Sequence, residues 1–153
     1  MVKEELVKEW LSKGKKDMED AQFLLDNDRT LENVAFHIHQ SAEKYLKGFL
    51  IHHGWKLEKI HDLVKLLEET IKIDKSFNKF ITQMRKITNF YFESRYPVGY
   101  EVEYTKQELK EAIKQTKEMI NLINTKINII IRKLNNNKRK KFHLQSKWNF
   151  FNS

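Results

Sequence analysis

The scarcity of glycine and proline constrains the fold of this chain more than any other feature. Only four glycines and one proline occur in 153 residues. A sheet of several strands needs tight turns, and those turns depend heavily on residues that tolerate special backbone angles, glycine and proline above all. The sequence therefore favours helices, and a chain of this length can bury the core of one domain without crosslinks.

The absence of cysteine removes several classes of chemistry. Without cysteine, the chain has no disulfides, no thiolate zinc sites and no cysteine nucleophile. The N-terminal segment MVKEELVKEW is charged from its third residue and has no apolar signal-peptide core. No apolar run approaches the ~20 residues needed to span a bilayer. We therefore expect a cytoplasmic protein without a membrane segment.

Positive charge is concentrated near the C-terminus. The formal net charge is +8, yet residues 1–131 hold 22 basic and 21 acidic side chains, whereas residues 132–153 hold seven basic and no acidic ones. Non-specific attraction to phosphate should therefore be concentrated in this segment. Its aromatic rings lie between cations, which suits stacking on single-stranded RNA, and the alternative is a disordered or partner-docking tail. The candidate contacts are Lys138, Arg139, Lys140, Lys141 and Trp148.

Apolar residues recur at helical spacing in five segments. The predicted helices cover residues 4–26, 31–53, 61–71, 74–97 and 105–134. Gly54 suits the end of the second helix, and Thr105 with Glu108 forms a capping box at the start of the last one. We predict an all-α, up-and-down helical bundle over residues 1–134, followed by a basic aromatic tail over residues 135–153.

The predicted second helix has two distinct faces. Its apolar face accounts for burial in a core and consists of Ala35, Ile38, Ala42, Tyr45, Leu46 and Phe49. Four polar side chains, His37, Gln40, Lys44 and Lys47, share another face within about 80° of arc. We call these four residues the polar stripe. It is either a solvated helix surface or a surface that binds a ligand or a second subunit.

A second polar group lies before the single proline. Arg95 follows Tyr91 by one turn and projects onto the apolar side of the predicted fourth helix. A guanidinium at such a place needs a partner, which can be a carboxylate, a backbone carbonyl or a phosphate. A structural ion pair with Glu43 or Glu93 is one interpretation, and contact with a nucleotide phosphate is the other.

Three motifs follow one another in the order FHIHQSAEKYLKGFLIHHGW, HDLVKLL and NFYFESRYP. Together with the segment from Trp10 to Leu25 they resemble the HEPN family (higher eukaryotes and prokaryotes nucleotide-binding domain), over residues 9–97. The resemblance implies a helical bundle that commonly dimerises. One branch partners a minimal nucleotidyltransferase in toxin–antitoxin-like systems, and another consists of metal-independent ribonucleases. The matched positions, with Tyr91 added, are the predicted ligand-binding or interface residues: His37, Gln40, Glu43, Lys44, Lys47, His61, Tyr91, Arg95 and Tyr96.

The ribonuclease branch uses an arginine that is followed, after four to six residues, by a histidine on the same helix. The imidazole moves the proton of a ribose 2′-hydroxyl while the guanidinium stabilises the charged phosphorane. No arginine here has a histidine at that spacing, and His37 lies one residue too far from Arg29. We therefore predict no catalytic residue, and a site outside the family motif that pairs His37 or His61 with Arg95 remains the alternative.

Other catalytic signatures are absent from the sequence. It has no glycine-rich phosphate loop, no GxSxG elbow and no HExxH pair, and we expect neither a metal nor a cofactor. The leading hypothesis is a non-catalytic module that binds a nucleotide or acts as the dimeric partner of a minimal nucleotidyltransferase. A ribonuclease toxin and an oligomerisation scaffold are the alternatives. The expected partners are a second copy, a nucleotidyltransferase, and a nucleotide or RNA, without a membrane.

Overall fold

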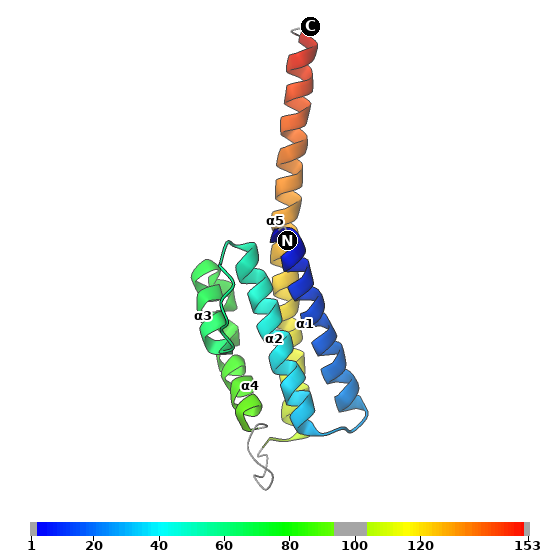
Figure 1. The fold of residues 1–153 in the computed structure, drawn as a ribbon, viewed down its shortest axis with the longest axis vertical. Coiled ribbons are helices and arrows are strands. Elements are labelled where there is room, and N and C mark those ends of the chain that lie inside the picture. Colours follow the sequence, from blue (N-terminus) through cyan, green and yellow to red (C-terminus); the bar gives the residue numbers. More distant parts are fainter. Residues whose placement is uncertain (1–2, 94–103, 152–153) are drawn as a thin grey trace. The chain divides into compact units, whose positions relative to one another are not determined.

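Six helical segments make up the part of the chain that the computed structural model describes, residues 3–93 and 104–151. They are α1 (Lys3–Asp26), α2 (Leu31–His52), α3 (Leu63–Ile73), the 3₁₀-helix η1 (Lys75–Phe80), α4 (Ile81–Glu93) and α5 (Lys106–Phe151) (Figure 1). No strand occurs within these residues. The predicted all-α bundle is therefore confirmed.

The chain divides into two units, Met1–Ile123 and Asn124–Ser153. The first unit contains α1 to α4 and the first part of α5, and the second contains the rest of α5. The predicted last helix ends at about residue 134, whereas α5 continues to Phe151 through the segment predicted as a tail. None of the described helices is long and apolar enough to cross a membrane.

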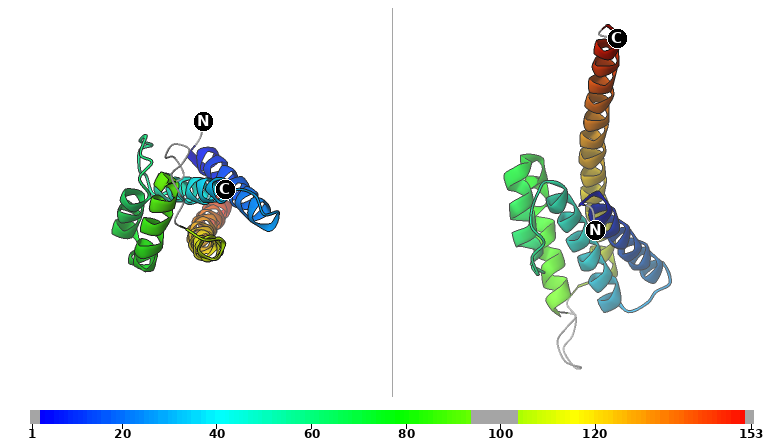
Figure 2. Two further views of the ribbon diagram at one scale, coloured as in Figure 1. Left: turned by 90° about the horizontal axis from the view of Figure 1, so that it is seen from below. Right: turned by 45° about the horizontal axis from the view of Figure 1, so that its top comes forward.

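Helix α2 is the central element of the first unit. It packs along α1 on one side and against α3 and α4 on the other (Figures 1 and 2). The predicted apolar face of α2 lies in the core, where none of its six side chains is more than 4% exposed. The Phe49 ring, for example, packs 5.0 Å from the ring of Phe77 in η1, measured between centroids. The polar stripe is therefore held in place by a helix that is anchored on both sides.

Two glycines allow α1 and α2 to approach closely. A Cβ atom on Gly14 would lie 2.7 Å from Cδ2 of Tyr45, and one on Gly48 would lie 2.9 Å from Cδ2 of Leu11. Both distances are shorter than van der Waals contact. The close approach also lets the Ser41 hydroxyl donate a 2.7 Å hydrogen bond to the Gly14 carbonyl. These contacts set how the two helices face each other at the site.

Two of the predicted helix boundaries rest on the expected backbone chemistry. Gly54 has a φ of +91°, in the left-handed region, and its N–H donates to the carbonyl of Ile51. The capping box also forms, because the Thr105 N–H donates to Glu108 Oε2 over 2.8 Å and the Glu108 N–H donates to Thr105 Oγ1 over 3.2 Å. The sequence therefore predicted these two ends correctly.

Two other boundaries differ from the prediction. Helix α3 begins at Leu63 instead of residue 61, because the Asp62 carboxylate accepts from the N–H groups of Val64 and Lys65 and so caps the first turn. The predicted fourth helix starts as the 3₁₀-helix η1 and becomes α-helical at Ile81. A 3₁₀-helix has three residues per turn, which places Phe77 and Phe80 on the same side, and both are buried.

Candidate functional site

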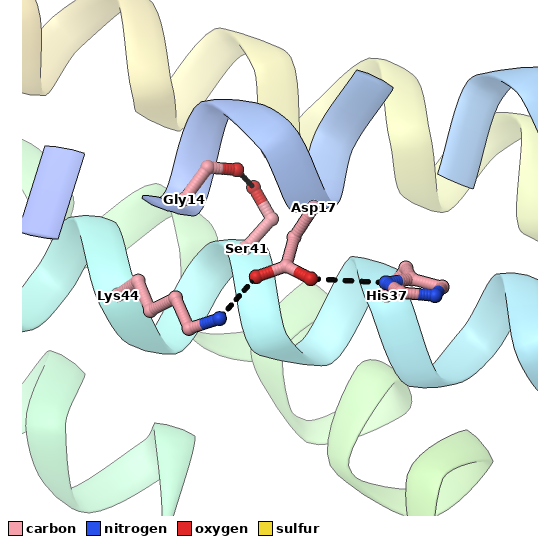
Figure 3. A network of polar contacts seen from close by, with 5 residues as sticks. All are labelled: Gly14, Asp17, His37, Ser41 and Lys44. Atoms are coloured by element: carbon pink, nitrogen blue, oxygen red, sulfur yellow. Dashed lines mark hydrogen bonds and ion pairs between the residues drawn. The ribbon is translucent and has the colours of Figure 1, made fainter. Parts of the chain in front are cut away.

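A buried carboxylate of α1 binds two side chains of the polar stripe (Figure 3). Asp17 Oδ1 lies 2.9 Å from His37 Nδ1, and Asp17 Oδ2 lies 2.5 Å from Lys44 Nζ. The Asp17 side chain is only 11% exposed. Because a carboxylate only accepts hydrogen bonds, the Nδ1 atom of His37 carries the proton in this pair. His37 and Lys44 thus hold α2 against α1, on either side of the Ser41–Gly14 hydrogen bond.

The same region brings together three groups that metal ions commonly use. Among the described residues, ligand atoms of Asp17, Asp20 and His37 lie within 4.8 Å of one another. The second oxygen of Asp17, however, already binds the ammonium group of Lys44. A cation placed here would be repelled by that ammonium at short range. The geometry is that of an ion pair between two helices, and we assign no metal to it.

Glu43, which directly precedes Lys44 on α2, forms a second buried ion pair. Its side chain is 4% exposed, and its Oε1 atom lies 2.7 Å from His61 Nδ1 and 3.7 Å from Lys47 Nζ. Lys47 is also 4% exposed, and its ammonium lies 5.3 Å from the centre of the Trp10 ring of α1, in a cation–π contact. Glu43 therefore connects α2 with the segment before α3, and its partner Lys47 contacts α1.

Unlike Glu43 and Lys47, His61 reaches the surface. Its side chain is 71% exposed, while its Nδ1 atom is held by the buried carboxylate of Glu43. As with His37, the carboxylate requires the proton on Nδ1. The Nε2 atom of a neutral His61 is therefore an acceptor that a ligand can reach, on a ring whose orientation is fixed.

A cleft of about 380 Å³ opens beside His61. Its lining comes from α2, from the segment before α3 and from α4, and consists of His39, Gln40, His61, Asp62, Thr88, Tyr91 and Phe92. We call it the α2–α4 cleft. The rings of His39 and Tyr91 stack in its wall, 4.0 Å apart and inclined by 18°. Phe92 is 57% exposed and provides an accessible aromatic surface.

The predicted site residues separate into groups in the structure. Within the chain, His37 and Lys44 bind Asp17, and Lys47 binds Glu43. Gln40, His61 and Tyr91 line the α2–α4 cleft. Arg95 and Tyr96 lie outside the described residues. The predicted nucleic-acid contacts on α5 are all exposed and belong to the second unit: Lys138, Arg139, Lys140, Lys141 and Trp148.

Several residues that shape these sites were not predicted from the sequence. Asp17 and Trp10 of α1 were not among the candidates, although both contact the polar stripe. Both lie in the segment from Trp10 to Leu25 that resembles the family, but nothing in the sequence marked either as a contact of the polar stripe, because an isolated aspartate or tryptophan on a helix is common. Thr88 and Phe92 also line the cleft. Phe92 lies within the motif NFYFESRYP, and Thr88 lies directly before that motif.

This chain is similar to one family model and to two solved structures. A family model described as "HEPN domain" matches residues 7–127. The crystal structure of ST0689, an archaeal HEPN homologue, has a TM-score of 0.64 at 21% identity and covers 79% of this chain and 97% of that chain. The crystal structure of TT1696 from Thermus thermophilus has a TM-score of 0.66 at 21% identity, over 78% of this chain and 97% of that one. Among curated proteins, no match is found.

Proposed function

The chain belongs to the HEPN family, and from this premise we propose that it is a nucleotide-binding module without a self-sufficient catalytic centre. We further propose that it acts as a dimer and as the partner of a minimal nucleotidyltransferase. The α2–α4 cleft is the observation that carries the nucleotide part of this proposal. It combines exposed aromatic surface with polar groups of fixed orientation, and its lining comes from the segments that carry the family-like motifs.

The size of the cleft suits a small ligand. Its volume of about 380 Å³ falls within the range of roughly 300–1,000 Å³ that is typical of small-molecule sites. It contains both hydrogen-bond donors and acceptors, since Gln40 contributes an amide and Asp62 a carboxylate. A nucleobase needs such edge contacts together with a flat apolar surface, and the cleft offers both.

Aromatic stacking supplies the second argument. The exposed ring of Phe92 is available to a base, and the Tyr91 ring lies 6.0 Å from it, between centroids. Stacking of a base on an aromatic side chain contributes about 1–3 kcal/mol. The polar stripe supports the proposal less well, because His37, Lys44 and Lys47 already bind carboxylates of the same chain.

Calorimetric titration of the full chain with AMP, ATP, GTP and UMP tests the nucleotide part. We expect at least one of them to bind, and Phe92→Ala to weaken that binding about tenfold because a stacking surface is lost. Phe23→Ala is the matched control, since Phe23 is 64% exposed on α1 and away from the cleft lining. Absence of binding for all four nucleotides, or equal effects of both variants, would contradict the proposal.

The partner part has its own test. The tagged chain is coexpressed with a minimal nucleotidyltransferase encoded beside its gene, and the complex is isolated. We expect both proteins to elute together as a complex whose mass includes two copies of this chain in addition to the nucleotidyltransferase. Elution of a monomeric chain without the nucleotidyltransferase would contradict this part, whatever the result of the nucleotide titration.

A metal-independent ribonuclease is the second candidate, and the His61–Glu43 pair favours it. A carboxylate that holds Nδ1 and leaves Nε2 accessible is a suitable arrangement for a general base. Between the two predicted histidines, the geometry favours His61, since the side chain of His37 is only 25% exposed. Incubation with single-stranded and structured RNA in EDTA distinguishes the candidates. Cleavage that is lost in both His61→Ala and Arg95→Ala would replace our proposal by this one.

A further inference from the structure

The second unit, residues 124–151 of α5, carries an apolar seam with a regular heptad spacing. Counted in alternating steps of three and four, its seam positions are Ile127, Ile130, Leu134, Asn137, Lys141, Leu144, Trp148 and Phe151. Ile127 is only 4% exposed, so the part of the seam that a partner can reach begins after it. This is the spacing by which two helices pack along each other in a coiled coil. Leu144 and Trp148 are 66% and 64% exposed. The end of the helix therefore presents large apolar side chains to solvent at seam positions.

The flanks of this seam are basic. Lys133, Lys140 and Lys147 recur every seven residues and occupy one flank, and Lys138 lies on the other. All four are exposed. No aspartate or glutamate follows Glu118 in the sequence. The lysines therefore have no acidic side chain within the same helical segment with which to pair.

This charge pattern argues against a second copy as the occupant of the seam. In a parallel pair of helices, each flank residue meets a residue on the opposite flank of the partner, which would bring Lys133 of one copy beside Lys138 of the other. Like charges at these positions destabilise a coiled coil. A helix with glutamate or aspartate on its flanks would instead form attractive ion pairs with these lysines.

The polar seam positions also favour an acidic partner helix. Asn137 and Lys141 interrupt the apolar residues, and polar groups within a seam are known to fix the register of a coiled coil. Covering Lys141 with a purely apolar helix would leave a buried ammonium without a partner. An acidic residue opposite Lys141 removes this cost and also selects one alignment of the two helices.

We propose that the part of α5 after Ile127 docks an acidic amphipathic helix of another protein. The apolar seam of that helix covers Leu144 and Trp148, and its carboxylates pair with the flanking lysines. RNA would be attracted by the same charge, but phosphate binding does not require apolar residues at heptad spacing. The interaction is separate from the nucleotide cleft, which contains no residue of this unit.

Binding of designed peptides to the full chain tests the proposal by fluorescence anisotropy. The probe is an acidic peptide of about four heptads, with isoleucine and leucine in the seam, glutamate on both flanks and one glutamate to face Lys141. A scrambled peptide of identical composition and a single-stranded RNA oligonucleotide are the comparison probes. We expect the heptad peptide to bind at least tenfold more tightly than the scrambled peptide and more tightly than the RNA.

Two variants with the same change in net charge locate the contact. Lys140→Glu alters a flank of the seam, whereas Arg139→Glu alters the side that faces away from the seam. We expect Lys140→Glu to weaken binding of the acidic heptad peptide about tenfold and Arg139→Glu to weaken it less than about threefold. Leu144→Asn, which removes an apolar seam contact, should weaken it as much as Lys140→Glu.

Several outcomes would overturn the proposal. Equal affinity for the heptad and scrambled peptides would show that charge alone attracts them. Tighter binding of the RNA oligonucleotide would assign the segment to nucleic acid. Self-association of the full chain in sedimentation, lost in Leu144→Asn, would assign the seam to a second copy. Nucleotide binding by the cleft should be unchanged in all three variants, so failure of this proposal is distinguishable from failure of the nucleotide proposal.

Discussion

The carboxylate of Asp17 fixes two side chains of α2 at once. It binds His37 and Lys44, which lie two turns apart on α2, with its two oxygen atoms. The side chains of the two α2 residues are about three-quarters buried. Removing a carboxylate from such surroundings is costly because it leaves the groups around it without a partner.

Asp17→Asn should therefore destabilise the bundle. The substitution keeps the size of the side chain but removes the charge that Lys44 binds, and the partly buried ammonium then lacks compensation. We expect the free energy of unfolding to fall by about 2 kcal/mol, measured by urea denaturation. Asp20→Asn is the control, because Asp20 lies on the same helix but is exposed, and it should change stability by less than about 0.5 kcal/mol. Equal effects of the two variants would contradict a stabilising role for the Asp17 contacts.

The polar stripe shows what a helical projection can and cannot predict. In the structure the stripe divides, because His37 and Lys44 bind Asp17 while Gln40 lines the α2–α4 cleft. Residue spacing placed these side chains on one face of α2, apart from its apolar residues. It could not predict that α1 covers much of this face, because the covering residues, Asp17 and Trp10, come from another helix. The predicted Glu43 lies beside this face and is buried, with both of its contacts supplied by cationic or imidazole groups.

At the scale of elements, the packing of α1 against α2 depends on the absence of a side chain at Gly14. The Tyr45 ring, which is 4% exposed, occupies the space that a Cβ atom on Gly14 would need. A glycine within a helix is ordinarily a position of low helix propensity. Helix propensity alone predicts that alanine would improve α1 here by about 1 kcal/mol, whereas the contact with Tyr45 predicts the opposite sign.

Gly14→Ala should lower the free energy of unfolding by about 1–3 kcal/mol, because the buried ring must move to admit a methyl group. Ser12→Ala provides the control for helix propensity, since Ser12 is exposed on the same helix, and it should leave stability unchanged or slightly raise it. Thermal and urea denaturation measure both variants. Stabilisation by Gly14→Ala would show that Tyr45 can move without cost and would contradict the close packing.

The boundaries of the elements were predictable where they depend on local chemistry. The left-handed Gly54 and the Thr105–Glu108 box use hydrogen bonds within a few residues, so the sequence alone indicated them. The start of α4 was not predictable in this way. The residue spacings of an α-helix and a 3₁₀-helix differ little over six residues. Burial of Phe77 and Phe80 against the core determines which of the two helix types forms.

At the scale of the whole molecule, the fold was predictable because composition, periodicity and family motifs all indicated helices. The α2–α4 cleft was predictable only in part. Gln40, His61 and Tyr91 were candidates, but the cleft also includes Thr88, which lies outside the family-like motifs, and Phe92, which lies within one but was not a candidate. The helical state of residues 135–151 was missed because the seam there contains polar residues, Asn137 and Lys141, which lower the apolar signal.

Shortening the chain tests whether the bundle depends on the distal helix. All buried side chains among the described residues lie before residue 128, so a chain that ends at residue 134 retains every one of them. We expect this shortened chain to unfold cooperatively, with a thermal midpoint within about 5 °C of the full chain, because little buried apolar surface is removed. It should also bind nucleotides as the full chain does, and it should lose binding of the acidic heptad peptide. A shortened chain with a helical circular dichroism spectrum but no cooperative transition would show that residues 135–153 contribute to the stability of the bundle, and would contradict the predicted domain boundary.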